Sequence, residues 1–124
     1  MALRVVTYNV HKCRGLDRRT TVMRIAEVLG EIRPDIAALQ EVLEDQAEAI
    51  ARELALTFVM GENRTLQGWA YGNAVLSRFP IRTSENYDLS VQGRESRGCL
   101  RADIVWPGSA VLHVFNVHLG ASFF

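Results

Sequence analysis

The first half of the chain alternates between short apolar runs and longer segments whose apolar residues recur at helical spacing. Residues 3–10 alternate β-branched and aromatic side chains with polar ones, and residues 35–42 are mostly apolar; both patterns are typical of strands. Residues 22–32 and 44–56 repeat apolar side chains every three or four positions, which predicts two amphipathic helices. Pro34 ends the first helix, because proline disfavours helical geometry in the residue before it. The order strand, helix, strand, helix predicts an α/β domain.

Beyond residue 56 the pattern changes to short segments rich in threonine, aromatic and β-branched residues, which predict strands. These strands are expected at Thr57–Met60, Asn73–Ser77, Tyr87–Val91, Cys99–Trp106 and Ala110–Leu119. The polar segment Gly61–Gly72 predicts a loop, and Pro107-Gly108-Ser109 predicts a tight turn between the last two strands. With the first half, this meander predicts a mixed sheet with both helices on one face. The pattern does not show what covers the other face.

The composition is that of one small globular domain over residues 1–124. Hydrophobic residues make up 48% of the chain, and 14 acidic side chains balance 14 basic ones. This neutral balance argues against a surface that coats nucleic acid broadly, but it leaves room for a local basic patch. No apolar run reaches the length of a membrane span, and the first residues lack the pattern of a secretory signal. Because Cys13 and Cys99 are too few for a disulfide framework, we expect a cytoplasmic protein with reduced thiols.

Three polar residues stand at the carboxyl ends of otherwise apolar predicted strands: Asn9, Glu41 and His118. Ligands of α/β proteins usually bind in the crevice outside such strand ends. Glu41 follows an apolar run, so its ionised carboxylate needs a partner, and a hard divalent cation would serve. Asn9 offers an amide to a metal-bound water or a phosphate oxygen, and His118 offers a charged donor or an acid–base group near neutral pH. Each also has a structural interpretation: Glu41 as an acid at the start of the next helix, Asn9 as a turn residue and His118 as a core histidine.

A basic segment follows the first predicted strand. Residues 12–24 contain five basic side chains, among them Lys12 and Arg14, against the single acid Asp17. The segment could hold a phosphate backbone, or it could be a solvated loop and helix start. Trp69 and Tyr71 in the predicted loop could likewise stack on a base or ring, or pack that loop against the domain.

Five segments, in order along the chain, resemble the endonuclease/exonuclease/phosphatase superfamily, whose fold is that of DNase I. They are TYNVH (Thr7–His11), PDIAALQEV (Pro34–Val42), YGNAVLSRFPI (Tyr71–Ile81), SRGCLRADI (Ser96–Ile104) and FNVHLG (Phe115–Gly120). No single segment is specific for the family. Together, the five segments are specific, because they follow the family's order and cover almost the whole chain. The resemblance implies hydrolysis of phosphodiesters or phosphomonoesters with Mg²⁺ or Mn²⁺ as cofactor. The substrate would be nucleic acid or another phosphoester, since one fold serves many substrates.

The resemblance also implies roles for individual residues. Glu41 matches the glutamate that binds the catalytic metal, and Asn9 matches an asparagine beside that metal and the scissile phosphate. His118 matches the histidine that contacts the phosphate, and Asn73 matches a residue that supports this histidine. Arg97 lies where relatives carry an arginine near the substrate. We therefore expect a catalytic set of His118, Asn9 and Asn73, the metal-binding residues Glu41 and Asn9, and the substrate-binding residues Arg97, Lys12 and Arg14.

Segments that match the second half of the superfamily are missing from the sequence. Relatives continue past the NVHLG segment into a strand with an Asp-Asn pair, and they end on a catalytic aspartate and an Asp-His pair, none of which is present. The expected fold is therefore α/β, half of the DNase I-like four-layered sandwich: a mixed sheet with helices on one face and an open apolar face. A homodimer would cover that face and form a composite active site. The alternative is an impaired or inactive half-domain, a truncated fragment that folds by self-association or by pairing with a separate second half.

Overall fold

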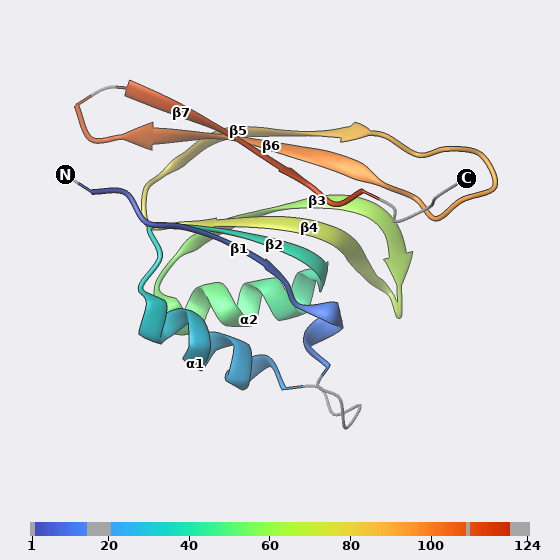
Figure 1. Cartoon of the computed structure of the whole chain (residues 1–124), viewed down its shortest axis with the longest axis horizontal. Helices are drawn as coiled ribbons and strands as arrows, with labels where there is room; N and C mark the ends of the chain where they lie inside the picture. Colours follow the sequence, from blue (N-terminus) through green and yellow to red (C-terminus); the bar gives the residue numbers. More distant parts are fainter. Residues whose placement is uncertain (1, 15–20, 109, 120–124) are drawn as a thin grey trace.

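Two helices lie against one face of a four-stranded sheet, and a three-stranded sheet lies against its other face (Figure 1). The computed structural model describes residues 2–14, 21–108 and 110–119. The strands of the first sheet, in spatial order, are β1 (Val5–Asn9), β2 (Ile36–Leu43), β4 (Trp69–Ser77) and β3 (Thr57–Leu66). The second sheet consists of β5 (Ile81–Asp88), β6 (Gly98–Trp106) and β7 (Ala110–Val117). The helical elements are α1 (Val22–Ile32), α2 (Glu44–Leu54) and the short turn η1 (His11–Cys13).

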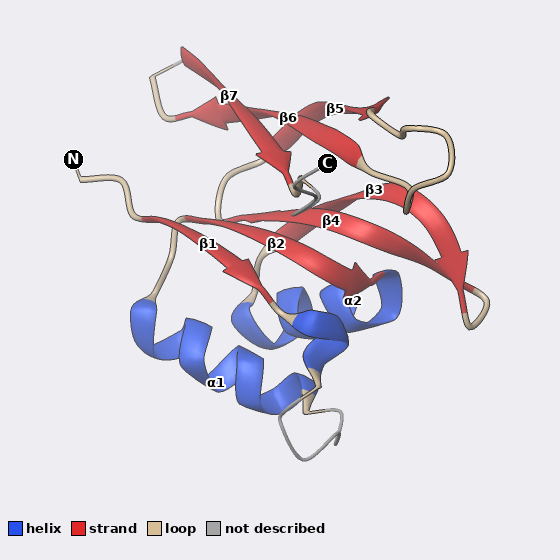
Figure 2. Cartoon of the chain, turned by 45° about the vertical axis from the view of Figure 1, so that its right-hand side comes forward, coloured by secondary structure: helices blue, strands red, loops and turns tan. Residues whose placement is uncertain are grey.

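The first sheet is mixed, as the sequence predicts. β1 runs parallel to β2, whereas β4 pairs antiparallel with both β2 and β3. The two helices lie on the same face of this sheet (Figure 2). They bury their apolar stripes there, where Leu29 of α1 and Ile50 of α2 join Leu39 and Leu76 in one core. Burying such side chains contributes roughly 1.5–3 kcal/mol each, so this face anchors the parallel strands that carry the predicted site.

The second sheet covers the face of the first sheet that the sequence leaves without a partner. Ile36 of β2 and Val75 of β4 pack in a second core with Leu100, Ala102 and Ile104 of β6. All five side chains are fully buried. The expectation of an open apolar face on the first sheet is therefore wrong, because the strands after residue 80 form a separate sheet that folds back onto it (Figure 2).

The open face lies instead on the outside of the second sheet. Side chains of β7 alternate, so that Val114 points towards the inner core while Phe115 and Val117 point outwards. Phe115 is 59% exposed and Val117 is 41% exposed, and Tyr87 of β5 is also exposed on this side. Within the described residues no helix or strand covers this face. Three layers of the four-layered sandwich are thus present.

Two strand predictions need correction. The segment Gly61–Gly72, predicted as a loop, belongs to the hairpin of β3 and β4, which pairs from Thr57↔Ser77 to Leu66↔Trp69. The backbone of this segment forms the hydrogen bonds of the hairpin, while many of its side chains are polar. The segment therefore lacks the alternating apolar pattern that predicts a strand. The strand expected at Tyr87–Val91 is β5, which begins at Ile81 and ends at Asp88, because exposed strands with polar side chains have no hydrophobic signal. Ser109 of the predicted turn lies outside the described residues.

Buried amides fasten the two sheets to each other near one end of the sandwich. Asn116 on β7 is 2% exposed and donates from Nδ2 to the carbonyls of Leu39 (2.9 Å) and Ala74 (2.8 Å). Its Oδ1 accepts a hydrogen bond from Gln40 Nε2 at 2.8 Å. Its main-chain carbonyl accepts one from Asn73 Nδ2 at 3.3 Å. These bonds fix β7 across β2 and β4, two residues before His118.

Among the described residues, no helix is long and apolar enough to cross a membrane.

The two cysteines are free, as the sequence predicts, and they differ in burial. Cys13 is fully buried, and burial, together with the nearby Asp45, raises the pKa of its thiol to about 12. Only the thiolate attacks disulfide reagents, so Cys13 will be inert in the native protein.

Ellman's reagent at pH 8 is therefore expected to titrate one thiol per native chain, the half-buried Cys99, and a second thiol only after unfolding. The Cys99→Ser variant should show no reactive thiol until denaturant is added. Equal rates for both thiols in the native protein would contradict the burial of Cys13.

Candidate active site

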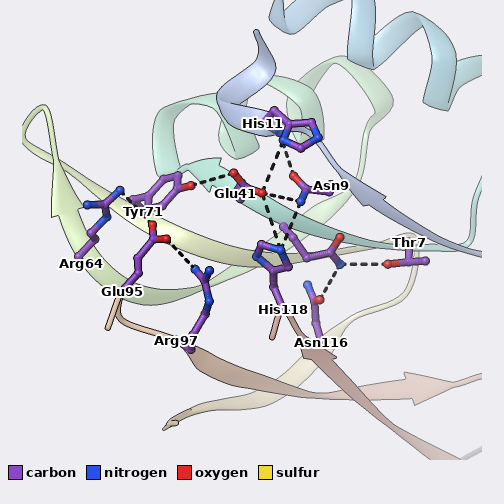
Figure 3. A network of polar contacts seen from close by, with 11 residues as sticks. Thr7, Asn9, His11, Glu41, Arg64, Tyr71, Glu95, Arg97, Asn116 and His118 are labelled. Carbon is purple, nitrogen blue, oxygen red and sulfur yellow. Dashed lines mark hydrogen bonds and ion pairs between the residues drawn. The ribbon is translucent and has the colours of Figure 1, made fainter. Parts of the chain in front are cut away.

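The carboxyl ends of β1, β2 and β7 bring Asn9, Glu41 and His118 together (Figure 3). Asn9 Nδ2 donates to Glu41 Oε2 at 2.5 Å, and His118 Nε2 lies 3.5 Å from that amide nitrogen. His118 Nε2 is 3.8 Å from Glu41 Oε2. β1 and β2 are parallel and in register with Asn9 opposite Gln40, so their ends meet at one edge of the sheet. β7 reaches the same edge from the second sheet.

Glu41 sits in an irregular part of β2. The register between β2 and β4 shifts between Leu39 and Val42, and the backbone of Glu41 has a φ of 55°. Such a bulge re-aims a side chain, here towards Asn9 and His118. Helix α2 begins at Glu44 with Leu43 as its N-cap. The interpretation of Glu41 as an acid at that helix start is therefore wrong.

The backbone directly after β1 is left-handed. His11, Lys12 and Cys13 have φ values of 49°, 58° and 58°. This conformation costs residues with a Cβ roughly 1–2 kcal/mol each. Hydrogen bonds from outside hold the turn: Thr21 N–H donates to the Cys13 carbonyl and Gln46 Nε2 donates to the Lys12 carbonyl, each at 2.7 Å. The structure thus maintains a strained turn at the edge of the site.

The turn directs His11 back to the site, and the sequence reasoning missed this residue. Its backbone N–H donates to Asn9 Oδ1 at 3.1 Å, and its Nδ1 lies 3.5 Å from Glu41 Oε2. The imidazole is 69% exposed. Glu41 therefore faces two histidines, His11 and His118. The only sequence signal was the place of His11 in the TYNVH segment, directly after the strand end.

Tyr71 lies on the other side of Glu41. Its hydroxyl donates to Glu41 Oε1 at 3.4 Å, and Lys12 Nζ lies 5.8 Å from the centre of its ring. Burial, and then the charges of Glu41 and Glu95, raise the pKa of Tyr71 to about 12, so it remains a hydrogen-bond donor. Because Tyr71 is buried, its ring packs within the protein, whereas Trp69 is exposed.

The ionised form of Glu41 is favoured by its neighbours. Burial alone would raise its pKa, but the hydrogen bond from Asn9, the charges of His11 and His118 and the bond from Tyr71 outweigh burial and lower the pKa below its ordinary value. A carboxyl group whose pKa is lowered in the folded state stabilises the fold at pH values above the ordinary pKa of a glutamate. That contribution is lost as the pH falls through the lowered value.

The Asn9→Ala variant is expected to have a raised Glu41 pKa, because the effect of burial stays while the strongest stabilising contact of the carboxylate is removed. Its acid unfolding should then begin at a higher pH than that of the parent protein. Carbon-detected NMR titration of the Glu41 carboxyl, assigned with Glu41→Gln, measures the shift. Thr7→Ala, which removes a bond to Gln40 but none to Glu41, is the control. An unchanged Glu41 pKa in Asn9→Ala would contradict the assigned role of Asn9.

The remaining predicted residues lie farther from Glu41. Asn73 is buried and donates to the carbonyls of Gly98 (3.2 Å) and Asn116, so it holds the backbone of β7 rather than the His118 ring. Arg14 lines a cavity of about 140 Å³ whose other lining residues include Asn9 and His11. Arg97 is ion-paired in the loop between β5 and β6. Of the basic segment, residues 15–20 lie outside the described part of the chain.

The donors present fit one hard cation only in part. Among the described residues, Glu41 is the single carboxylate where the three strand ends meet, and Asn9 presents Nδ2 to it while its Oδ1 accepts from His11. Mg²⁺ is commonly held by one or two carboxylates, with water and substrate phosphate completing the octahedron, so Glu41 suits it. Within the described residues, no group of three or more His, Cys, Asp or Glu side chains could hold a metal ion.

Comparison with known proteins agrees with this fold. The family model described as Endonuclease/Exonuclease/phosphatase family matches residues 6–118. The Uncharacterized protein YbhP of Escherichia coli (strain K12) is 35% identical over 137 residues, covering 96% of this chain and 54% of its own. YbhP of Shigella flexneri gives the same values.

Solved structures with similar folds include the following two. The endonuclease/exonuclease/phosphatase from Beutenbergia cavernae DSM 12333 has a TM-score of 0.77 and 27% identity, with 94% of this chain and 38% of that chain covered. TDP2 of D. rerio, complexed with single strand DNA product, has a TM-score of 0.76 and 19% identity, with 98% and 47% covered.

The chain belongs to the endonuclease/exonuclease/phosphatase family. It spans about half the length of the curated relatives it matches.

Proposed function

We propose that this chain carries one half of a divalent-metal-dependent phosphoesterase site that hydrolyses phosphodiesters. The observation that carries the proposal is the convergence of Asn9, Glu41 and His118 from three strands at one edge of the first sheet. Family membership supports the same reaction class. A nucleic-acid strand is the substrate we favour, since one protein of this fold, D. rerio TDP2, is complexed with single strand DNA product.

The residues of the site divide the work by their chemistry. Glu41, ionised at neutral pH, and the adjacent Asn9 would hold Mg²⁺ or Mn²⁺. When bound, the ion would polarise a phosphoryl oxygen and stabilise charge on the leaving oxygen. Asn9 fixes the orientation of the Glu41 carboxylate through its amide. His118 and His11, both accessible, would donate hydrogen bonds to phosphate oxygens, and Lys12, Arg14 and Arg97 would add positive charge around the substrate.

The groups still needed, a general base and further metal ligands, would come from a second copy of this chain. Among the described strands, β1 and β7 are edge strands that end at the site, so each has a side with which no described strand pairs. Val5 on β1 is 54% exposed, and Phe115 and Val117 on β7 are exposed as well. Pairing or packing of two copies along these edges would remove apolar surface from water and bring two sets of site residues closer.

Light scattering after size exclusion tests the homodimer. A mass twice that of the chain is expected for the parent protein, and Phe115→Asp should shift it towards the monomer because a charge would be buried in the contact. A monomer at all accessible concentrations would overturn the homodimer proposal.

A second candidate is an inactive or impaired half-domain, and one observation favours it: Glu41 is the only carboxylate at the meeting point of the strand ends in the described residues. Activity separates the two candidates. Hydrolysis of bis-p-nitrophenyl phosphate and nicking of plasmid DNA are expected with Mg²⁺ or Mn²⁺ and should cease with EDTA. A protein that is inert with either metal supports the half-domain, which would then require a separate second half.

A further inference from the structure

A carboxylate bridges two arginines at the side of the candidate site. Glu95 lies in the loop between β5 and β6, where its Oε1 is 3.3 Å from Arg64 Nη2 on β3. Its Oε2 is 3.3 Å from Arg97 Nη1 in the same loop. Figure 3 shows the two guanidinium groups on either side of this single carboxylate. Two segments that are distant in sequence thus share one anion.

The bridge formed by Arg64, Glu95 and Arg97 is separated from Glu41 by one side chain, that of Tyr71. The guanidinium of Arg64 lies 5.1 Å from the centre of the Tyr71 ring, and the Tyr71 hydroxyl donates to Glu41. The bridge therefore lies beside Glu41, where the proposed function places the scissile phosphate.

The contacts of Glu95 are of a kind that another anion can replace. Both are longer than the 2.7–2.9 Å typical of strong charge-assisted hydrogen bonds. The side chains of Arg64 and Glu95 are 41% and 45% exposed, and exposed ion pairs contribute little to stability. A phosphate group offers the same pair of oxygens to guanidinium forks, so the two arginines are suited to either anion.

We propose that Arg64 and Arg97 form a second anion subsite, which binds the phosphate next to the scissile one, and that Glu95 occupies this subsite until substrate displaces it. This inference rests on the proposed function, because it places the scissile phosphate at Glu41. It specifies the substrate class as a chain of at least two phosphodiesters, the chemistry of a single nucleic-acid strand. A substrate with one phosphate gains nothing from the subsite.

Binding of a fluorescein-labelled single-stranded thymidine octanucleotide, followed by anisotropy in EDTA so that no cleavage occurs, tests the subsite. Glu95→Gln should bind up to about fivefold more tightly than the parent, because the competing carboxylate is gone. Arg64→Gln should bind about tenfold more weakly and lower the salt slope by about 1. Glu48→Gln and Arg52→Gln, which make the same charge changes in an exposed pair on α2, are the matched controls and should bind like the parent.

Hydrolysis of bis-p-nitrophenyl phosphate, which has one phosphate, distinguishes failure of the subsite from failure of the proposed function. Its KM should not change in Glu95→Gln or Arg64→Gln. If the octanucleotide binds as expected but nothing is hydrolysed, Arg64 and Arg97 form an anion site for a nucleic-acid strand, and the proposed function fails. If hydrolysis occurs but Glu95→Gln binds the octanucleotide no more tightly, or more weakly because Glu95 only fastens the loop, the subsite is overturned. Absence of binding by both the parent and Glu95→Gln also overturns it.

Discussion

The Glu41→Gln variant will hydrolyse bis-p-nitrophenyl phosphate about a thousandfold more slowly than the parent protein. Glutamine keeps the size of the side chain and removes its charge, so a hard cation loses its anionic ligand. A bound metal supplies several kcal/mol of charge stabilisation in phosphoryl transfer, and each 1.36 kcal/mol corresponds to a factor of ten in rate. The loss should appear in the initial rates at saturating Mg²⁺ or Mn²⁺.

Two controls accompany this measurement. Glu48→Gln removes one negative charge from an exposed pair on α2 and should retain the parent rate. The circular dichroism of Glu41→Gln should match that of the parent, because the β2 backbone and both cores do not depend on the carboxylate. A variant with the parent fold that keeps more than a tenth of the activity would exclude Glu41 as the metal ligand.

The Asn116→Leu variant will be destabilised by about 3–5 kcal/mol. Leucine is close in volume, so the change removes hydrogen bonds more than packing. The carbonyls of Leu39 and Ala74 and the amide of Gln40 would each lose a partner inside the protein. An unsatisfied buried polar group costs roughly 1–3 kcal/mol.

Urea unfolding measures this loss as a lower midpoint at an unchanged m-value. Met23→Leu, at an exposed position on α1, should change the free energy of unfolding by well under about 1 kcal/mol as the control. A change of less than 1 kcal/mol in Asn116→Leu would show that the amides do not fasten the sheets. Activity should fall as well, since β7 carries His118 to the site.

Asn9, Glu41 and His118 could be predicted from the sequence because two simple signals coincide there. Each is a polar residue at the end of an apolar run, and each lies in a segment that resembles the family. The structure brings all three within 4 Å of one another. Their roles in metal and phosphate binding stay predictions until the variants are measured.

His11 and Tyr71 could not be predicted in the same way. The contact of His11 depends on three consecutive positive φ angles, and neither composition nor periodicity signals that backbone conformation in residues other than glycine. The contact of Tyr71 depends on a long, polar hairpin that lacks an alternating apolar pattern. In both cases the long-range contacts of the chain, rather than local propensity, decide the conformation.

The arrangement of the layers could not be predicted from the sequence either. Apolar alternation in β6 and β7 indicates that one face of each strand is buried, but it does not state against what. The sequence could support one continuous sheet or two stacked sheets. The two-sheet arrangement is favoured because Leu100, Ala102 and Ile104 pack against Ile36 and Val75, an apolar surface of the first sheet.

The left-handed turn at His11–Cys13 lowers the stability of the fold but places two side chains at the site. Glycine adopts a positive φ without the clash of a Cβ, so glycine at position 11 or 12 would relax the backbone. The same change would delete the imidazole that faces Glu41 or the ammonium that faces Tyr71. Directed evolution for thermostability alone is therefore expected to enrich glycine at these positions, and only selection that also scores activity would keep His11 and Lys12.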